Sequence, residues 1–217
     1  MANYYFPSCK LRTYSPKNAF KLEQYLQEKH GLLIANCCRL QHKHLTPEDT
    51  AYYICNTCAA ILREGNLKTK VQSIWELLLE DRDFVYPNYQ GEPMSIQDCW
   101  RVYDNSAQQL AVRKIIKLLN ISVYELGDNF IKADFCGTSL WEQLPSQNAI
   151  LAPDRFLIKG RNKFIVRSDR ERQELMQKHC QQFRTAKVVS YCVSCTKGLA
   201  LGGANVQHLL DLLFREA

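Results

Sequence analysis

Nine of the ten cysteines in this 217-residue chain fall into two sets that repeat the same order, and no other feature constrains the fold as strongly. Each set opens with a single cysteine, continues with a Cys-Cys or Cys-Gly dipeptide, and closes with a CxxC motif. The first set is Cys9, Cys37, Cys38, Cys55 and Cys58, and the second is Cys99, Cys136, Cys192 and Cys195. This recurrence predicts an internal duplication with one cysteine-based site in each copy.

The segments between the first five cysteines predict a succession of strands and helices. Ser15 and Pro16 are typical of a helix start, and Gly31 is typical of a helix end. Short β-prone or apolar runs predict strands, and apolar residues at helical spacing predict helices. The predicted strands are residues 3–6, 32–35 and 51–54, and the predicted helices are residues 16–30 and a segment that starts at Ala59.

The second half of the chain repeats this plan with one insertion. Its predicted strands are residues 94–97, 121–126 and 188–191, and Ser106 is expected to cap the helix that follows Cys99. The closing segments of the two copies, residues 71–78 and 206–213, have similar sequences, and each is predicted to be a helix. Between Cys136 and Cys192 lie 55 residues, against 16 between Cys38 and Cys55. The insertion contains a predicted helix that begins at the capping-box pattern from Ser168 to Glu171.

The alternation of strands and helices predicts an α/β protein of two similar lobes. Each lobe is expected to be a small mixed or parallel sheet with flanking helices. The cysteines then follow the carboxyl ends of strands, where ligand sites form in open α/β sheets. We assign residues 1–90 to the first unit and residues 91–217 to the second.

Composition favours a chain in a reducing compartment. Apolar residues make up 46% of the chain and charged residues 23%, so a core can form without disulfides. The N-terminus lacks the basic start and apolar run of a secretory signal, and no run of 18 uncharged apolar residues occurs. We therefore expect a cytoplasmic protein with no transmembrane segment and no structural disulfide.

Charge and motifs argue against two common classes of ligand. The net charge is +6, yet the basic residues are spread along the chain without a dense run, which argues against nucleic-acid binding. No GxGxxG or GxxxxGK[ST] loop is present, so we expect no bound nucleotide cofactor.

A CxxC motif between a strand and a helix favours thiolate chemistry. The positive end of the helix and nearby backbone N–H groups stabilise the thiolate. One such motif fits a thioredoxin-like redox pair, half a zinc site or part of an iron–sulfur site. Because a structural zinc ion takes four ligands, the five cysteines of the first unit favour iron and sulfide. The four of the second unit suit zinc, a [2Fe–2S] cluster or a [4Fe–4S] cluster equally.

The repeated order of a single Cys, then Cys-Cys or Cys-Gly, then CxxC resembles the cysteine-rich CCG domains of heterodisulfide reductase and of related iron–sulfur oxidoreductases. The resemblance spans nearly the whole chain. In that family, five cysteines of a complete domain hold a noncubane [4Fe–4S] cluster, and the first set matches this pattern in all five positions. The second set is incomplete because Phe135 replaces the first cysteine of the pair, although Gly137 is retained. Family members with a four-cysteine domain carry a different cluster, or zinc, in it.

The resemblance implies an iron–sulfur redox protein, one component of an oxidoreductase complex, that transfers electrons to or from a disulfide, a thiol or a similar acceptor. Its partners would be flavoprotein or ferredoxin-type redox subunits, and its substrate a small disulfide or thiol. Two alternatives from other classes stay open. One is a zinc-stabilised structural or regulatory module. The other is a metal-free dithiol oxidoreductase that cycles one of the CxxC motifs.

Several residues beside the cysteines are weaker candidates. Arg39 occupies the position where the family has glycine after the cysteine pair. Arg39, Arg101 and Lys10 flank cysteines and are able to lower a thiolate pKa, but surface bases are common and we leave them outside the site. The histidines of the loop after the cysteine pair, His42 and His44, are treated as solvated. Cys180 fits no repeat position and is interpreted as a core residue on an apolar helix face.

Overall fold

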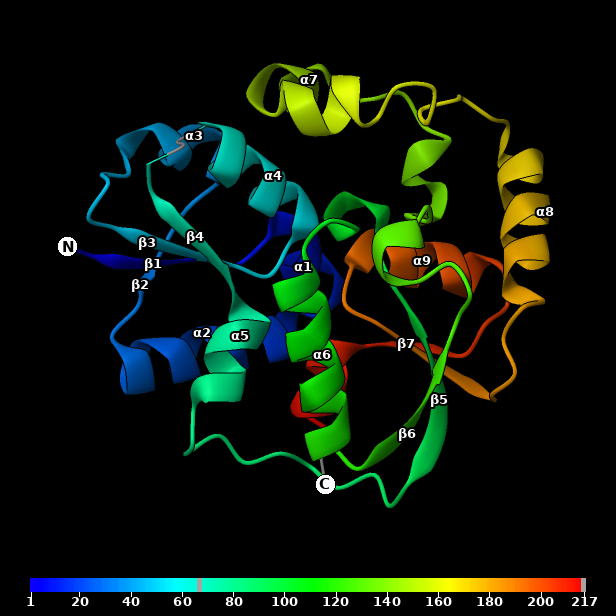
Figure 1. Ribbon diagram of the computed structural model, residues 1–217, viewed down its shortest axis with the longest axis horizontal. Coiled ribbons are helices and arrows are strands. Elements are labelled where there is room, and N and C mark those ends of the chain that lie inside the picture. The colour runs from blue at the N-terminus through cyan, green and yellow to red at the C-terminus, as the bar shows by residue number, and fades with distance from the viewer. Residues whose placement is uncertain (66–67, 216–217) are drawn as a thin grey trace. The chain divides into compact units, whose positions relative to one another are not determined.

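The structure is a computed structural model that describes residues 1–65 and 68–215 (Figure 1). It divides into two compact units. The first unit comprises Met1–Leu77 with Leu144–Arg161, and the second comprises Leu78–Gln143 with Asn162–Ala217. The division into residues 1–90 and 91–217 follows the sequence repeat, whereas the compact units follow packing, which assigns residues 144–161 of the insertion to the first unit.

The first unit is built on a four-stranded parallel sheet. Its strands are β1 (Asn3–Phe6), β2 (Leu33–Ile34), β3 (Thr50–Tyr53) and β4 (Lys70–Ser73), in the order β2-β1-β3-β4. The helical segments of this unit are α1 (Cys9–Tyr14), α2 (Pro16–His30), α3 (Cys38–Gln41), η1 (His42–His44), α4 (Asn56–Gly65), α7 (Ser146–Leu151) and the π-helical η5 (Asp154–Ile158), and α5 (Ile74–Glu80) begins in it.

The second unit repeats this topology. Its strands are β5 (Glu92–Gln97), β6 (Ile121–Glu125), β7 (Lys187–Ser190) and β8 (Val206–His208), all parallel and in the order β6-β5-β7-β8. Its helical segments are η2 (Trp100–Val102), α6 (Ser106–Leu118), η3 (Phe130–Lys132), η4 (Gly137–Leu140), α8 (Asp169–Cys180), α9 (Val193–Leu201) and α10 (Leu209–Leu213). The predicted α/β fold of two similar lobes is therefore confirmed.

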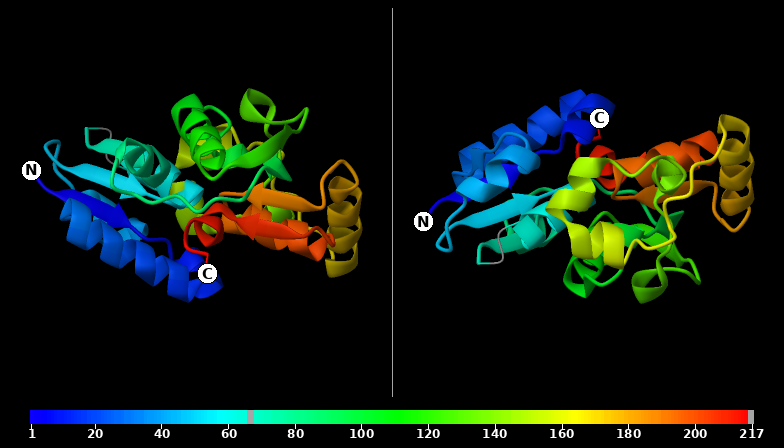
Figure 2. Two further views of the ribbon diagram at one scale, coloured as in Figure 1. Left: turned by 90° about the horizontal axis from the view of Figure 1, so that it is seen from below. Right: turned by 90° about the horizontal axis from the view of Figure 1, so that it is seen from above.

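Each sheet is covered by helices on both faces, which explains the burial of its central strands. In the first unit α2 lies on one face and α4 on the other, as right-handed crossovers in opposite directions from the central strands require (Figure 2). A parallel sheet enclosed in this way buries side chains on both faces. Tyr5 and Tyr53 of the first sheet and Met94 and Val189 of the second are at most 1% exposed.

The predicted ends of several helices are confirmed. Pro16 occupies the first turn of α2, and Gly31 ends this helix in the left-handed conformation with φ of 61°. Ser168 and Glu171 form the predicted capping box of α8. One cap was predicted wrongly: Asn105, not Ser106, caps α6, because the Asn105 side chain accepts a hydrogen bond from the backbone N–H of Gln108.

The closing segments of the two units begin as strands rather than as helices. Residues 71–73 belong to β4 and residues 206–208 belong to β8, and the helices start only at Ile74 and Leu209. The physical reason is that β3 and β7 each leave an open edge to which these residues add a parallel ladder. The apolar residues at helical spacing from Val71 to Leu78 predicted a helix over the whole segment, but Val71 lies in β4 and the helix starts at Ile74.

Candidate metal centre

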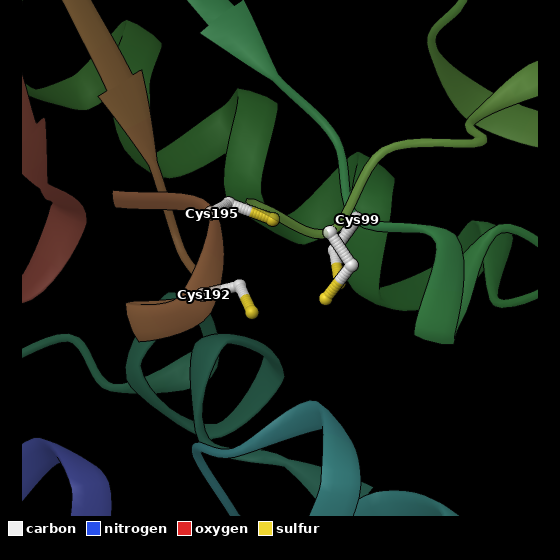
Figure 3. Close-up of side chains that lie close together, drawn as sticks. Cys99, Cys192 and Cys195 are labelled. Atoms are coloured by element: carbon white, nitrogen blue, oxygen red, sulfur yellow. The ribbon is translucent and has the colours of Figure 1, made fainter. Parts of the chain in front are cut away.

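Four cysteines of the second unit come together at the carboxyl end of its sheet. Cys99 follows β5, Cys136 immediately precedes η4, and the CxxC motif of Cys192 and Cys195 joins β7 to α9. Their Sγ atoms all lie within 4.8 Å of one another, and the Cys99 and Cys136 sulfurs are 3.5 Å apart. In Figure 3, Cys192 at the start of α9 and Cys195 in its first turn project toward Cys99.

The burial of this group fits a metal or cluster better than free thiols. Cys99, Cys136 and Cys195 are completely buried, and Cys192 is 8% exposed. No disulfide joins any of the ten cysteines, all of which the structure describes. A closed set of four sulfur donors is the ligand set of structural zinc sites and of iron–sulfur clusters. The residues present therefore fit a metal centre, although the donor set alone does not specify which one.

Arg101 contributes a positive charge to this centre. Its Nη1 donates a hydrogen bond of 2.6 Å to Cys136 Sγ, and its Nη2 donates one of 3.1 Å to Ser139 Oγ. Burial alone would raise the pKa of Cys136, but hydrogen bonds from Cys192, Cys195 and Cys99 and the charge of Arg101 outweigh it and hold this pKa well below its usual range. A metal bound by four thiolates would carry excess negative charge, part of which Arg101 offsets.

A buried carboxylate anchors the two chain segments that carry the first and third ligands. Asp98 directly precedes Cys99 and is completely buried. Arg113 donates to both of its oxygens at 2.7 and 2.9 Å, and the hydroxyl of Tyr191, the residue before Cys192, donates at 2.7 Å. A buried ion pair is stabilising only when its hydrogen bonds are complete, as they are here. Asp98 therefore fixes the spacing between Cys99 and Cys192.

Gly137 permits a close backbone approach beside Cys136. It has φ of +57°, and a Cβ atom at this position would lie 1.9 Å from the backbone oxygen of Ser194 within the CxxC motif. Gly198 of α9 packs against it in turn, since a Cβ there would lie 2.4 Å from Gly137 Cα. Only glycine fits this contact, which brings Cys136 next to the CxxC turn.

Phe135 fills the position of the missing cysteine by packing. Its ring stacks on the imidazole of His179, with centroids 3.9 Å apart and planes 10° apart. Its carbonyl accepts a hydrogen bond of 2.8 Å from the backbone N–H of Trp100. Burial lowers the pKa of His179 to about 4, so this imidazole is neutral at physiological pH. At this position the second unit therefore has an aromatic ring that packs on His179, where the first unit has the sulfur of Cys37.

The five cysteines of the first unit are arranged more openly. Cys9 is exposed and Cys37 and Cys55 are half-buried, whereas Cys38 and Cys58 are buried. Burial and the neighbouring thiols of Cys37 and Cys38 raise the pKa of Cys9. Among the described residues, the tight group of four sulfurs occurs in the second unit alone.

Part of the first cysteine set surrounds a pocket. It has a volume of about 100 Å³ and is lined by four of the five cysteines, Cys9, Cys37, Cys38 and Cys58, together with Phe6, Pro7, Ser8, Arg12 and Asn36. Hydrogen bonding with Cys38 and Cys55, together with burial, raises the pKa of Cys58 well above its usual range, while the hydrogen bond from Cys58 lowers the pKa of Cys38. The pocket leaves part of the first cysteine set accessible from outside.

The weaker candidates beside the cysteines have identifiable roles. His42 is buried, and its Nδ1 lies 2.9 Å from the Cys38 carbonyl oxygen. The prediction that His42 is solvated was therefore wrong. His44 is exposed, as predicted. Cys180 is half-buried, and its Sγ lies 3.5 Å from the Leu199 carbonyl oxygen. Arg101 is the site residue that the sequence analysis missed, since it donates to Cys136 Sγ. Its position two residues after Cys99 could have indicated this role.

No family model, curated protein or solved structure matches this chain. Within the described ranges, no helix is long and apolar enough to cross a membrane.

Proposed function

We propose that this chain is an iron–sulfur redox protein that resembles the CCG-domain component of heterodisulfide reductase, with a closed metal centre in the second unit and an accessible one in the first. The observation that carries the proposal is the set of four buried sulfurs within 4.8 Å of one another, repeated in topology by a second cysteine set. Four sulfur donors that converge in this way form the ligand set of zinc sites and iron–sulfur clusters.

The size of the second centre favours a small ion. Zinc–sulfur bonds of about 2.3 Å place the corners of a sulfur tetrahedron about 3.8 Å apart. The distance of 3.5 Å between the Cys99 and Cys136 sulfurs is close to that value. A cubane cluster binds each cysteine to a different iron and separates the sulfurs further. Within this proposal the second centre therefore holds a single zinc or iron ion and supports the fold.

The first cysteine set is the proposed place of redox chemistry. Five thiols are more than one tetrahedral ion requires, and they match the five-ligand pattern of a noncubane [4Fe–4S] cluster. When bound, such a cluster would supply one-electron chemistry and iron sites for substrate sulfur. The pocket beside Cys9 and Cys37 would admit a small disulfide or thiol. Flavoprotein or ferredoxin-type subunits in the cytoplasm would exchange electrons with it.

The zinc-module alternative also has an observation in its favour, namely the tetrahedral size of the second centre. If both centres held zinc, the protein would be a structural or regulatory module without redox activity. Colour separates the two functions directly, because iron–sulfur clusters absorb broadly in the visible range and zinc thiolates do not.

The deciding experiment compares one cysteine from each set in anaerobically purified protein. Cys38→Ser should remove the sulfide, the iron and EPR signal of the first centre and most of the redox activity, and leave the second metal in place. Cys195→Ser should remove the second metal and weaken folding. Cys180→Ser is the matched control and should change neither metal content nor spectrum, since Cys180 lies outside both sets. Iron and sulfide contents that Cys38→Ser leaves unchanged would replace this proposal with the zinc module.

A further inference from the structure

Residues 144–161 lie in the insertion of the second sequence repeat but pack as part of the first unit. They contain α7 and η5, and α7 contacts α4, the helix that begins in the first CxxC motif (Figure 1). Ala152 and Phe156 of this segment are at most 1% exposed, so it is firmly packed rather than a loose excursion. In the second unit, backbone hydrogen bonds from Ile165 to Leu140 and from Arg167 to Trp141 close the base of the insertion.

Two side chains of the first unit hold this segment. Arg39 of α3 donates from Nη1 to Gln147 Oε1 at 2.9 Å and from Nη2 to Asn148 Oδ1 at 2.8 Å. Glu64, near the end of α4, accepts hydrogen bonds from the backbone N–H groups of Asp154 at 2.7 Å and Arg155 at 3.0 Å. One segment therefore binds both cysteine-bearing helices of the first unit.

The two helices also meet each other directly at their far ends. His42, which follows α3, packs so closely on Gly65 that a Cβ atom there would lie 2.4 Å from the His42 ring. The Nδ1 atom of His42 in turn contacts the Cys38 carbonyl. Displacement of α3 would therefore move Cys38, and displacement of α4 would move Cys58 and its neighbour Cys55.

We propose that residues 144–161 form a strap that holds α3 and α4 together and so fixes the first cysteine set, with Arg39 and Glu64 as its positioning residues. Arg39 of the first unit and Gly137 of the second occupy equivalent positions, each directly after a cysteine. The second unit fixes its cysteine turn by direct backbone packing on glycine, and the first fixes the same turn through a long side chain and an added segment. The functional meaning of this strap rests on the proposed role of the first cysteine set.

The strap also determines the electrostatics next to Cys38. The partners of Arg39 on the strap are two neutral amides, so the guanidinium is oriented without being neutralised by them. A fixed cation beside bound thiolates is one of the features by which a protein adjusts a cluster's reduction potential. Loss of Arg39 should therefore lower the potential of the first centre.

Site-resolved alkylation of the full-length, anaerobically purified protein tests the strap. Arg39→Ala and Glu64→Gln should each speed alkylation of Cys38 and Cys58 about tenfold, because each removes charge-assisted hydrogen bonds that keep the helices closed. Cys192 and Cys195 should keep their rates, which separates release of the strap from general unfolding. Lys43→Ala, which removes an exposed cation from the same region, is the matched control and should have no effect.

Two further measurements make the outcome decisive. Arg39→Lys keeps the charge but not the two-pronged contact, so it should retain the reduction potential and give an intermediate alkylation rate. Faster alkylation in protein that proves to lack iron would uphold the strap and refute the proposed redox function. Unchanged alkylation of Cys38 and Cys58 in both Arg39→Ala and Glu64→Gln would overturn the strap, whatever metal is bound.

Discussion

The two units share a sheet topology and differ in how they treat their cysteines. The second unit closes completely around four sulfurs, whereas the first leaves Cys9 exposed and surrounds a pocket. The same strand order therefore produces a closed centre in one copy and an open one in the other. The difference shows that topology places cysteines at the ends of strands, while the residues next to them decide how tightly they close.

Two positions account for much of this difference. The residue after the second-strand cysteine is Gly137 in the second unit and Arg39 in the first, and only glycine allows the backbone contact with the CxxC turn. The residue before the first cysteine is the buried, fully bonded Asp98 in the second unit and Ser8 in the first. Anchoring by a carboxylate and contact through a glycine both bring the sulfurs of the second unit together.

Charge divides the units in the same way. The first unit has 13 lysines and arginines against 7 aspartates and glutamates, and the second has 15 of each. The whole excess of +6 thus belongs to the unit with the accessible cysteines. Such a field raises the local concentration of anions near that unit.

The sharpest test of the comparison is a methyl group added to one glycine in each unit. Gly137→Ala should lower the free energy of unfolding by about 4 kcal/mol and weaken metal retention, because the new Cβ overlaps the Ser194 carbonyl. Gly31→Ala is the matched control, since Gly31 has nearly the same φ but nothing within 4 Å of its Cβ position. It should cost about 1 kcal/mol. Equal losses in urea denaturation would show that the contact at Gly137 is unimportant.

A smaller effect is expected from Asp98, which precedes the first cysteine of the second unit, where the first unit has Ser8. Asp98→Asn should lower the free energy of unfolding by about 3 kcal/mol, because one accepting oxygen becomes an amide nitrogen, which cannot accept a hydrogen bond from Arg113, and the buried Arg113 loses its counter-charge. Asp154→Asn serves as the control in the first unit, where the pair with Lys159 is solvent-exposed and should contribute less than about 0.5 kcal/mol. A loss of unfolding free energy below about 1 kcal/mol for Asp98→Asn would show that Asp98 does not anchor the second centre.

The smallest effect concerns pH and the imidazole of His179, which stacks on Phe135. The pKa of His179 is lowered by burial to about 4 in the folded state, against 6.5 in an unfolded chain. As the pH falls from 6.5 to 4, the unfolded chain therefore takes up a proton that the folded chain does not, and stability decreases. His179 should contribute about 2 kcal/mol to this decrease.

Comparison with His179→Gln isolates that contribution. The difference in unfolding free energy between the two proteins should change by about 2 kcal/mol between pH 7 and pH 4. A difference that stays constant over this range would mean that His179 is solvated and that the stack on Phe135 is open.

Much of the fold could be predicted from local patterns. The strands that precede the two cysteine sets, the helix that begins at Pro16 and is capped by Gly31, and the capping box at Ser168 follow from propensity and capping, which act over a few residues. The error at residues 71–73 has the same origin, because an apolar spacing of three and four residues does not show that an open strand edge lies nearby. Local patterns therefore predicted six of the eight strands among the described residues, and missed β4, β8 and short helices such as α1 and α3.

The sequence by itself determined the duplication, the α/β class and the two cysteine sets, because all three are recorded in residue order and spacing. Only the tertiary structure decided that four sulfurs of the second set meet, that Arg101 and Asp98 support them, and that residues 144–161 join the first unit. These outcomes depend on contacts between residues far apart in the chain. The hydrogen bonds of Arg39 to Gln147 and Asn148 span more than a hundred residues, and no local pattern specifies such a partner.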